Sequence, residues 1–497
     1  MGLKIGGQVE KIDGRRLSYN QFCERFLQKN EPVVLTGLMD DWRACRDWVN
    51  HNAQPNLHFF ATHFGNSTVQ VAECSKKEFT DQARVEMSVS EFIGNWGKIS
   101  STEGNSNYSG SAENSQSLLY LKDWHFVKEY PDYVAYSTPL FFRDDWLNLY
   151  LDIYHMHRDP DTTYREKNEV NCSDYRFVYM GAKGTWTPFH ADVFRSYSWS
   201  ANVCGKKKWH FLSPSQCRLA FDRNVKNCVY DIFADVSEKQ FPGFRKAVWL
   251  ECTQEEKEII FVPSGWYHQV HNEADTISIN HNWFNAYNLP LVWKLLVKDY
   301  YEAKEYIEDI KDICDDFEGL CQRNLAANTG MNFSDFFIFI TRFSFANLII
   351  LHNNLKDYPG PLFGSCFHIR NLILNLTSIK RVALKMQSMN DWRENSRISL
   401  DFEEIAKEPE FAQLCFALHR TYEIPNESCK QFFKVNNPGR AYLSPLNIVE
   451  ATCPNISVPE DLVRVIDCAL EKLSVVTNMG DLGYSSALDV LETLTIS

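Results

Sequence analysis

A histidine and an aspartate stand two positions apart in the stretch TPFHADVF, residues 187–194. Successive side chains of a β-strand alternate between its two faces, so His190 and Asp192 would present an imidazole and a carboxylate on one side. Such a pair is two-thirds of the two-histidine, one-carboxylate triad that holds Fe(II) and leaves positions open for substrate and oxygen. The pair predicts a metal site, provided that a second histidine approaches from elsewhere in the chain.

The pair alone is a weak signal, because 14 histidines and 64 acidic residues in 497 positions produce such pairs by chance. The sequence also contains His157-Arg-Asp159 and His271-Asn-Glu273. His157 lies in a polar stretch interrupted by proline, and the His271 pair falls where a turn is expected. Only His190 enters a region with strand patterning, so we favour it as a ligand.

Two candidates for the second histidine lie in FVPSGWYHQVHNE, residues 261–273. The Pro-Ser-Gly sequence predicts a turn, and WYHQV predicts the strand that leaves it. His268 and His271 are an odd number of residues apart, so a regular strand would turn them to opposite faces. One of the two can be the ligand, and the spacing alone does not choose between them.

A run of three lysines in GKKKWHF, residues 205–211, is usually a solvated turn. Strand alternation, however, places Lys207 on the same face as Trp209 and Phe211, and Lys206 and Lys208 on the other face. A lysine that points into an aromatic interior is unfavourable unless it meets an anion. The far carboxylate of an iron-bound dicarboxylate would be such an anion.

The surrounding patterns predict the elements that would carry these residues. Residues 174–284 contain short strand-like runs separated by Gly and Pro, which predict a barrel or sandwich of antiparallel strands. The first hundred residues mix helix and strand signals, and the polar stretch 100–117 is expected to be a disordered insertion. Beyond residue 290 the pattern becomes helical, most clearly at 291–310, 336–351 and 459–473. We therefore expect one domain over 1–290 and a mostly helical region over 291–497.

Composition excludes several classes of protein. Hydrophobic residues make up 44% and charged residues 23%, as in a folded globular protein, and the net charge of −13 argues against direct nucleic-acid binding. The 15 cysteines contain no CxxC pair, which argues against a zinc ribbon. We expect no signal peptide, no membrane span and a location in the cytoplasm, with the nucleus as the alternative.

The order of these motifs, TPFHADVF, GKKKWHF, FVPSGWYHQV and ISINHNW, resembles the Jumonji-C (JmjC) oxygenases that depend on 2-oxoglutarate and Fe(II). The resemblance covers roughly residues 30–285. EPVVLTGLMDDW and FFRDDWLN further resemble the JmjC-domain protein 4 subgroup, whose members look like lysyl hydroxylases of the translation release factor. The resemblance implies an α+β fold, with a double-stranded β-helix (a jelly-roll, cupin-like barrel), flanking helices and the helical C-terminal region.

The resemblance also assigns roles to individual residues. It implies Fe(II) ligation by His190, Asp192 and His268, and it prefers His268 over His271. It implies that Lys207 pairs with the far carboxylate of 2-oxoglutarate. Further residues of the co-substrate pocket would be Tyr120, Thr187 and Asn282. Ser200 departs from the pattern, because several family members carry Asn at that place.

The function implied is a protein hydroxylase that uses Fe(II), 2-oxoglutarate and O₂, with ascorbate in support. Its expected substrate is a lysine of a translation release factor, and the C-terminal helices could form a homodimer surface. Two alternatives remain open. A histone lysine demethylase begins with the same C–H hydroxylation, and a barrel without activity could serve as a protein-binding module.

Overall fold

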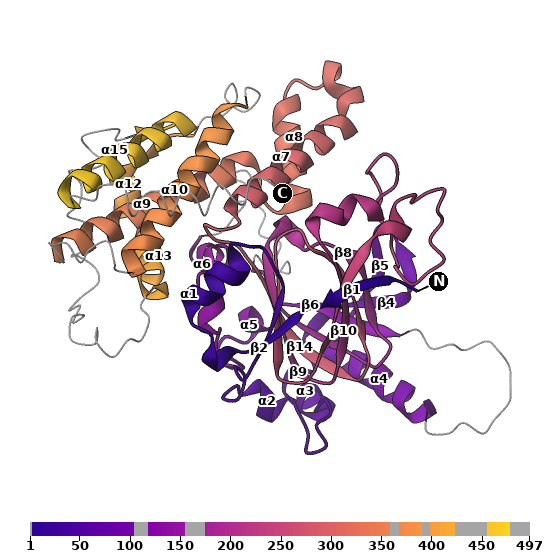
Figure 1. The fold of residues 1–497 in the computed structure, drawn as a ribbon. Coiled ribbons are helices and arrows are strands. Elements are labelled where there is room, and N and C mark those ends of the chain that lie inside the picture. The colour runs from indigo at the N-terminus through magenta and orange to yellow at the C-terminus, as the bar shows by residue number, and fades with distance from the viewer. Residues whose placement is uncertain are drawn as a thin grey trace. The chain divides into compact units, whose positions relative to one another are not determined.

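The computed structural model describes residues 2–103, 118–154, 174–357, 367–389, 398–422 and 455–477 (Figure 1). The chain divides into two compact units. The first, the barrel unit, consists of Met1–Phe142 and Asp174–Trp283, and the second, the helical unit, of Arg143–Ser173 and Phe284–Ile496. The division at Trp283 precedes the boundary expected at 290, and no sequence pattern indicated that residues 143–154 belong to the helical unit. Most of the insertion expected at 100–117, namely residues 104–117, lies outside the described residues.

Two sheets form the barrel unit. The five-stranded sheet has the order β1 (Lys4–Gln8), β11 (Val248–Gln254), β10 (Lys207–Leu212), β13 (Tyr267–Asn272), β8 (Trp186–His190). The nine-stranded sheet has the order β2 (Glu10–Asp13), β3 (Val33–Thr36), β12 (Glu258–Val262), β9 (Tyr197–Cys204), β14 (Thr276–Trp283), β7 (Arg176–Gly181), β6 (Leu119–Trp124), β4 (Thr68–Glu78), β5 (Asp81–Ser88). From β7 to β14 the chain passes repeatedly from one sheet to the other, and neighbouring strands are antiparallel. This is the expected jelly-roll, cupin-like barrel.

Short helices and turns accompany these strands in the barrel unit. The α-helices are α1 (Tyr19–Phe22), α2 (Ala44–Asp47), α3 (Leu57–Phe64), α4 (Val89–Glu103) and α5 (Phe126–Glu129), with a π-helical turn, η2, at Cys23–Leu27. The 3-10 turns are η1 (Gly14–Arg16), η3 (Leu140–Phe142), η4 (Val193–Arg195), η5 (Pro214–Ala220) and η6 (Phe244–Lys246).

Strand β9 shows why the sequence folds into a closed barrel. All eight of its residues are buried, so both faces of the strand are covered. On the outer face the indole of Trp199 stacks on Phe142, with ring centroids 5.5 Å apart. On the inner face the polar side chains of Ser198, Ser200 and Asn202 alternate with these aromatic residues. The apolar face anchors the strand, and the polar face lines the barrel interior.

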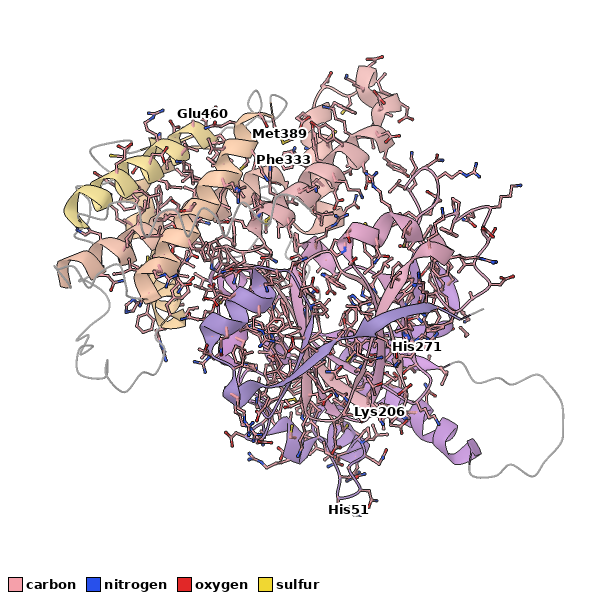
Figure 2. The ribbon with its side chains drawn as sticks, viewed as in Figure 1. His51, Lys206, His271, Phe333, Met389 and Glu460 are labelled. Carbon is pink, nitrogen blue, oxygen red and sulfur yellow. The ribbon has the colours of Figure 1, made fainter. Side chains whose placement is uncertain are left out.

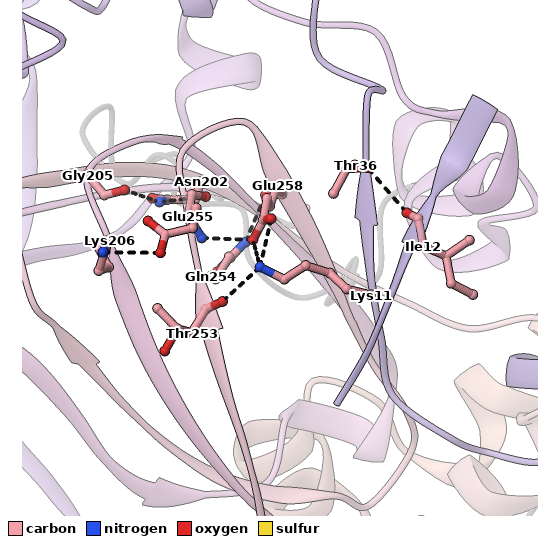
Figure 3. A network of polar contacts seen from close by, with 10 residues as sticks. All are labelled: Lys11, Ile12, Thr36, Asn202, Gly205, Lys206, Thr253, Gln254, Glu255 and Glu258. Atoms are coloured by element: carbon pink, nitrogen blue, oxygen red, sulfur yellow. Dashed lines mark hydrogen bonds and ion pairs between the residues drawn. The ribbon is translucent and has the colours of Figure 1, made fainter. Parts of the chain in front are cut away.

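A buried polar network ties the two sheets together (Figure 3). The side-chain amide of Gln254, fully buried, donates to the backbone carbonyls of Ser200 (2.7 Å) and Glu258 (2.9 Å) and accepts from the indole N–H of Trp209 (2.9 Å). Lys11 of β2 pairs with Glu258 at 2.8 Å. Because these bonds join β2, β9, β10, β11 and β12, they fix the register of the barrel wall on which Lys207 lies.

The helical unit contains α6 (Trp146–Ile153), α7 (Leu289–Tyr306), the 3-10 turn η7 (Glu308–Ile313), α8 (Phe317–Thr329), α9 (Phe333–Asp357), α10 (Phe367–Gln387), α12 (Phe402–Lys407), α13 (Pro409–Thr421) and α15 (Pro459–Thr477). Strands β15 (Leu400–Asp401) and β16 (Asn455–Ile456) form a two-stranded sheet. The helices predicted at 291–310 and 459–473 are confirmed as α7 and α15.

Helix α9 is longer than the apolar stretch at 336–351 indicated. In length and composition Phe333–Asn354 could cross a membrane, but 78% of its most apolar window is buried inside the protein. Arg342, in the middle of the helix, donates to the hydroxyl of Tyr150 at 2.8 Å. Burial and an internal partner for the charge are the properties of a core helix.

Candidate metal centre and co-substrate pocket

The three predicted metal ligands converge in the barrel unit. The ligand atoms of His190, Asp192 and His268 all lie within 4.8 Å of one another. One local expectation was wrong: strand β8 ends at His190, so Asp192 does not follow it on a regular strand face. Asp192 instead precedes the 3-10 turn η4, and this turn directs its carboxylate toward the two imidazoles.

The backbone after Asp192 is strained. Phe194 and Arg195 have φ angles of 54° and 46°, in the left-handed region that residues other than glycine rarely adopt. Such residues cost about 1–3 kcal/mol each and cluster at functional sites. Phe194 is 2% exposed and packs edge to face against Tyr175, which holds the turn in place.

The ladder between β8 and β13 distinguishes the two candidate histidines. His268 lies opposite His190, with imidazole centroids 4.4 Å apart. His271, labelled in Figure 2, lies opposite Trp186 and stacks on its indole at 5.6 Å with nearly parallel planes. His268 therefore faces the site and His271 packs elsewhere, as the spacing and the resemblance together predicted.

Backbone carbonyls fix the orientation of both imidazoles. The Nδ1 of His190 lies 2.7 Å from the carbonyl of Pro188, and the Nδ1 of His268 lies 3.2 Å from that of Trp266. A carbonyl only accepts, so each Nδ1 donates a proton to it, and Nε2 is the ring nitrogen left for a metal. This arrangement orients metal-binding histidines.

The electrostatics of the cluster suit a divalent cation. Burial, and next the neighbouring His190, lower the pKa of His268 to about 4, so its imidazole is neutral at pH 7. The hydroxyl of Ser198 donates to Oδ2 of Asp192 at 2.6 Å. Two imidazoles and one carboxylate form the donor set that Fe(II) oxygenases use, so these residues fit iron. Iron binding itself stays a prediction.

Lys207 is a buried cation inside the barrel. It is 2% exposed, and its Nζ lies 3.1 Å from the hydroxyl of Tyr120 and 3.1 Å from Oδ1 of Asn272. Among the described residues, no carboxylate lies within ion-pair distance of it. Burial is the main cause that lowers the pKa of Lys207 to about 7. An ammonium with neutral partners only is the polar group that a bound dicarboxylate would complete.

Asn272 and Thr185 extend this pocket and were not predicted. The amide of Asn272 donates to the hydroxyl of Thr185 at 2.8 Å, and that hydroxyl donates to the carbonyl of Ala182. Asn272 lies opposite Lys207 in the β10–β13 ladder. It is four residues beyond His268, so strand alternation from His268 could have placed it on the inner face.

The remaining predicted residues lie in the same barrel. Thr187 is opposite Val270, and a bulge in the β8–β13 ladder lets it share a face with His190 although an odd number of residues separates them. Asn282 lies opposite Ser198, the residue whose hydroxyl donates to Asp192, and its own amide donates to the hydroxyl of Ser196 at 3.2 Å. The co-substrate roles of Tyr120, Thr187, Lys207 and Asn282 stay predictions.

Ser200, the departure from the family pattern, is 3% exposed, and its hydroxyl has no hydrogen-bond partner among the described residues. It lies on the inner face of β9, two residues beyond Ser198. A buried, unpartnered hydroxyl indicates a water or ligand partner in the barrel interior.

Comparisons with known proteins agree with this geometry. A family model described as a cupin-like domain matches residues 19–288. The chain is 54% identical over 468 residues to a protein of Arabidopsis thaliana named arginine-specific demethylase JMJ20, covering 94% of this chain and 97% of that protein.

Two animal proteins named 2-oxoglutarate and iron-dependent oxygenase JMJD4 are also similar. The Danio rerio protein is 39% identical over 348 residues, covering 68% of this chain and 76% of the relative. The Homo sapiens protein is 34% identical over 342 residues, covering 67% and 75%. With the jelly-roll barrel and the converging triad, these similarities show that the chain belongs to the cupin-like JmjC family of 2-oxoglutarate- and iron-dependent oxygenases.

Proposed function

We propose that this protein hydroxylates a C–H bond of a basic side chain in a protein substrate, and that a lysine of a translation release factor is its first candidate target. The observation that carries the proposal is the convergence of His190, Asp192 and His268 within 4.8 Å, in the same barrel as the uncompensated cation of Lys207. When bound, Fe(II) and 2-oxoglutarate supply the activation of O₂, coupled to decarboxylation of the oxoacid. Ascorbate would support the reaction by keeping the iron ferrous.

The protein's own residues would bind and orient the reactants. The Nε2 atoms of His190 and His268 and the carboxylate of Asp192 would hold the metal. With three protein ligands, the metal would keep positions open for the oxoacid and O₂. Lys207 and the hydroxyl of Tyr120 would hold the far carboxylate of 2-oxoglutarate. Fixing both ends of the oxoacid determines its orientation before reaction.

A second candidate is arginine demethylation. It is favoured by the relative named as an arginine-specific demethylase, which is 54% identical over 94% of this chain. Hydroxylation of an N-methyl carbon followed by loss of that carbon begins with the same C–H step, so the metal centre serves both reactions. The two candidates differ in the substrate atom that reaches the metal.

Mass spectrometry separates the candidates. The purified protein is incubated with Fe(II), 2-oxoglutarate and ascorbate, together with either a lysine peptide of the release factor or methylated arginine peptides. Lysyl hydroxylation adds one oxygen to the unmethylated peptide, whereas demethylation removes a methyl group from the arginine peptide. Methylated histone lysine peptides test the lysine demethylase alternative in the same assay.

The matched control is Asp192→Ala, which removes one metal ligand. Succinate formation in the wild type and its loss in the variant would support an enzyme. If the wild type forms no succinate with any peptide, the barrel is better explained as a non-catalytic protein-binding module.

We further propose that the protein acts in the cytoplasm or nucleus, without direct nucleic-acid or membrane binding, and that the C-terminal helices carry a homodimer surface.

A further inference from the structure

A second lysine is buried beside the predicted co-substrate pocket. Lys122 follows Tyr120 by two residues on β6, and its ladder with β4 is regular there, so both side chains lie on the same face. Lys122 is 2% exposed. Its Nζ donates to Oε1 of Gln82 at 2.8 Å, and the carboxylate of Asp81 lies 3.9 Å away. No motif in the sequence singles out this lysine.

Lys122 and Lys207 lie close to the same aromatic ring. The Nζ of Lys122 lies 5.5 Å from the ring centroid of Tyr120, and the Nζ of Lys207 lies 5.7 Å from it. The two ammonium groups belong to different sheets, and Lys122 adds to the effect of burial in lowering the pKa of Lys207. Two lysine side chains therefore approach the ring of Tyr120 from two different sheets.

The acidic groups near Lys122 are shared with another cation. Arg84 pairs with Asp123 at 2.5 Å and with Asp81 at 3.2 Å. The side chain of Asp81 is 46% exposed, so water screens its interaction with Lys122. Asp123 also accepts from the hydroxyl of Tyr179. Lys122 is therefore the buried member of this cluster, next to Tyr120, and the carboxylates of Asp81 and Asp123 are partly exposed.

A purely structural role would not require a charge. Gln82 already joins β5 to β8, because its amide donates to the carbonyl of Trp186 at 3.1 Å. A buried ammonium with one short hydrogen bond and one long ion pair is unfavourable compared with a neutral side chain of similar size. Lys122 becomes favourable when an anion occupies the space beside Tyr120, since the attraction then offsets part of the desolvation.

We propose that Lys122 is a positioning residue for the co-substrate, a second cation that acts across Tyr120 on the far carboxylate of a dianionic 2-oxoacid. The proposal rests on the proposed function, because it assumes that the pocket binds 2-oxoglutarate. It specifies the ligand class: Lys122 favours dicarboxylates over monocarboxylic oxoacids of similar length.

Binding to the full-length, zinc-substituted protein tests this without turnover. Isothermal titration calorimetry compares N-oxalylglycine, a non-reacting dianion, with 2-oxopentanoate, which lacks the far carboxylate. Lys122→Met should weaken N-oxalylglycine binding about tenfold, the effect of one partly screened charge, and change 2-oxopentanoate binding less than about twofold. Lys122→Arg keeps the charge and should restore the preference for the dianion.

The matched control is Lys208→Met, which removes a lysine on the other face of β10 that pairs with Glu251 at 2.9 Å. It should leave both affinities unchanged. If Lys122→Met does not fold, as judged by its melting temperature, Lys122→Gln keeps a donor toward Gln82 and takes its place. Equal weakening of both ligands, or no weakening of N-oxalylglycine, overturns the inference. Absence of N-oxalylglycine binding by the wild type instead contradicts the proposed function.

Discussion

Each of the two units buries a charged side chain, but only one of these charges is satisfied by the protein. In the helical unit, the carboxylate of Asp144 is 3% exposed and accepts from the indole of Trp146, the hydroxyl of Tyr422 and the amide of Asn285 at 2.8–3.0 Å. In the barrel, Lys207 is buried to the same degree, and its hydrogen-bond partners are the phenol of Tyr120 and the amide oxygen of Asn272. The first arrangement stabilises a fold, and the second leaves a charge for a ligand to complete.

The pKa values of these two groups differ for the same reason. Burial raises the pKa of Asp144 to about 6 despite its three donors, and burial lowers the pKa of Lys207 to about 7. Both shifts favour the neutral form. For Asp144 the charged form is still the main one at pH 7, whereas Lys207 stands at its titration midpoint. Asp144 has three donors for its charge, whereas the ammonium of Lys207 has two partners for its three N–H groups. A buried charge whose hydrogen bonds the protein leaves incomplete therefore identifies a ligand site better than burial alone does.

The largest expected effect comes from removing the satisfied charge. Asp144→Ala leaves the three donors without an acceptor in a buried site, and each unpaired buried donor costs ~1–3 kcal/mol. We expect the free energy of unfolding to fall by at least about 3 kcal/mol in urea denaturation. Glu410→Ala, an exposed acid of α13, is the matched control and should change stability by less than about 0.5 kcal/mol. Equal effects would contradict the role given to the Asp144 network.

The opposite result is expected for the unsatisfied charge. Lys207→Met removes an ammonium that no described carboxylate compensates, so the ligand-free protein should be as stable as the wild type or more stable by about 1–2 kcal/mol. Co-substrate binding should be lost, because the far carboxylate loses its cation. Thermal melts with and without N-oxalylglycine measure both. A large loss of stability in the ligand-free variant would mean that Lys207 is a structural residue.

Lys207 also predicts a pH dependence. Because its lowered pKa is about 7 in the empty pocket, the lysine loses its proton as the pH rises through 7, and a dianion must restore that proton when it binds. The dissociation constant of N-oxalylglycine should therefore rise above pH 7, by up to about tenfold per pH unit. Calorimetry at pH 6.5–8.5 in buffers of different ionisation enthalpy measures the proton uptake. A flat profile would place the pKa of Lys207 well above 8.

A smaller effect is expected at Gly181, which lets Tyr120 approach β7. A Cβ at this position would lie 2.4 Å from Oγ1 of Thr185 and 2.6 Å from Cδ2 of Tyr120. Gly181→Ala should displace the phenol from Lys207 and weaken N-oxalylglycine binding several-fold. Gly97→Ala, in α4, is the control, because a Cβ there meets nothing within 4 Å and alanine favours a helix. Unchanged binding in Gly181→Ala would argue against a contact between Tyr120 and the ligand.

The sequence predicted the strands well because each carries a regular pattern. In β9 polar and apolar residues alternate throughout, and in β14 the alternation is interrupted only by His281. This alternation is also what builds the barrel. Local spacing was less informative where the backbone is irregular. Asp192 lies beyond the end of β8, and Thr187 reaches the inner face through a bulge that no spacing rule indicated.

Residues that depend on strand pairing were the hardest to predict. Asn272 and Thr185 belong to the pocket because β10, β13 and the start of β8 meet there. The pairing register of these strands, which the sequence does not show, determines that meeting point. The position of Lys122 beside the pocket depends on the place of β6 between β7 and β4 in the nine-stranded sheet. The place of residues 143–154 in the helical unit likewise follows from long-range packing, of which the local sequence carries no signal.

Metal binding by two histidine variants tests the central claim most directly. Equilibrium dialysis with Co(II), followed by the visible absorption of the bound ion, would compare His268→Ala with His271→Ala, two histidines on the same strand. The account predicts one Co(II) per wild-type chain, the same for His271→Ala, and loss of the ion in His268→Ala. Retention of Co(II) by His268→Ala, or its loss in His271→Ala, would contradict the triad of His190, Asp192 and His268.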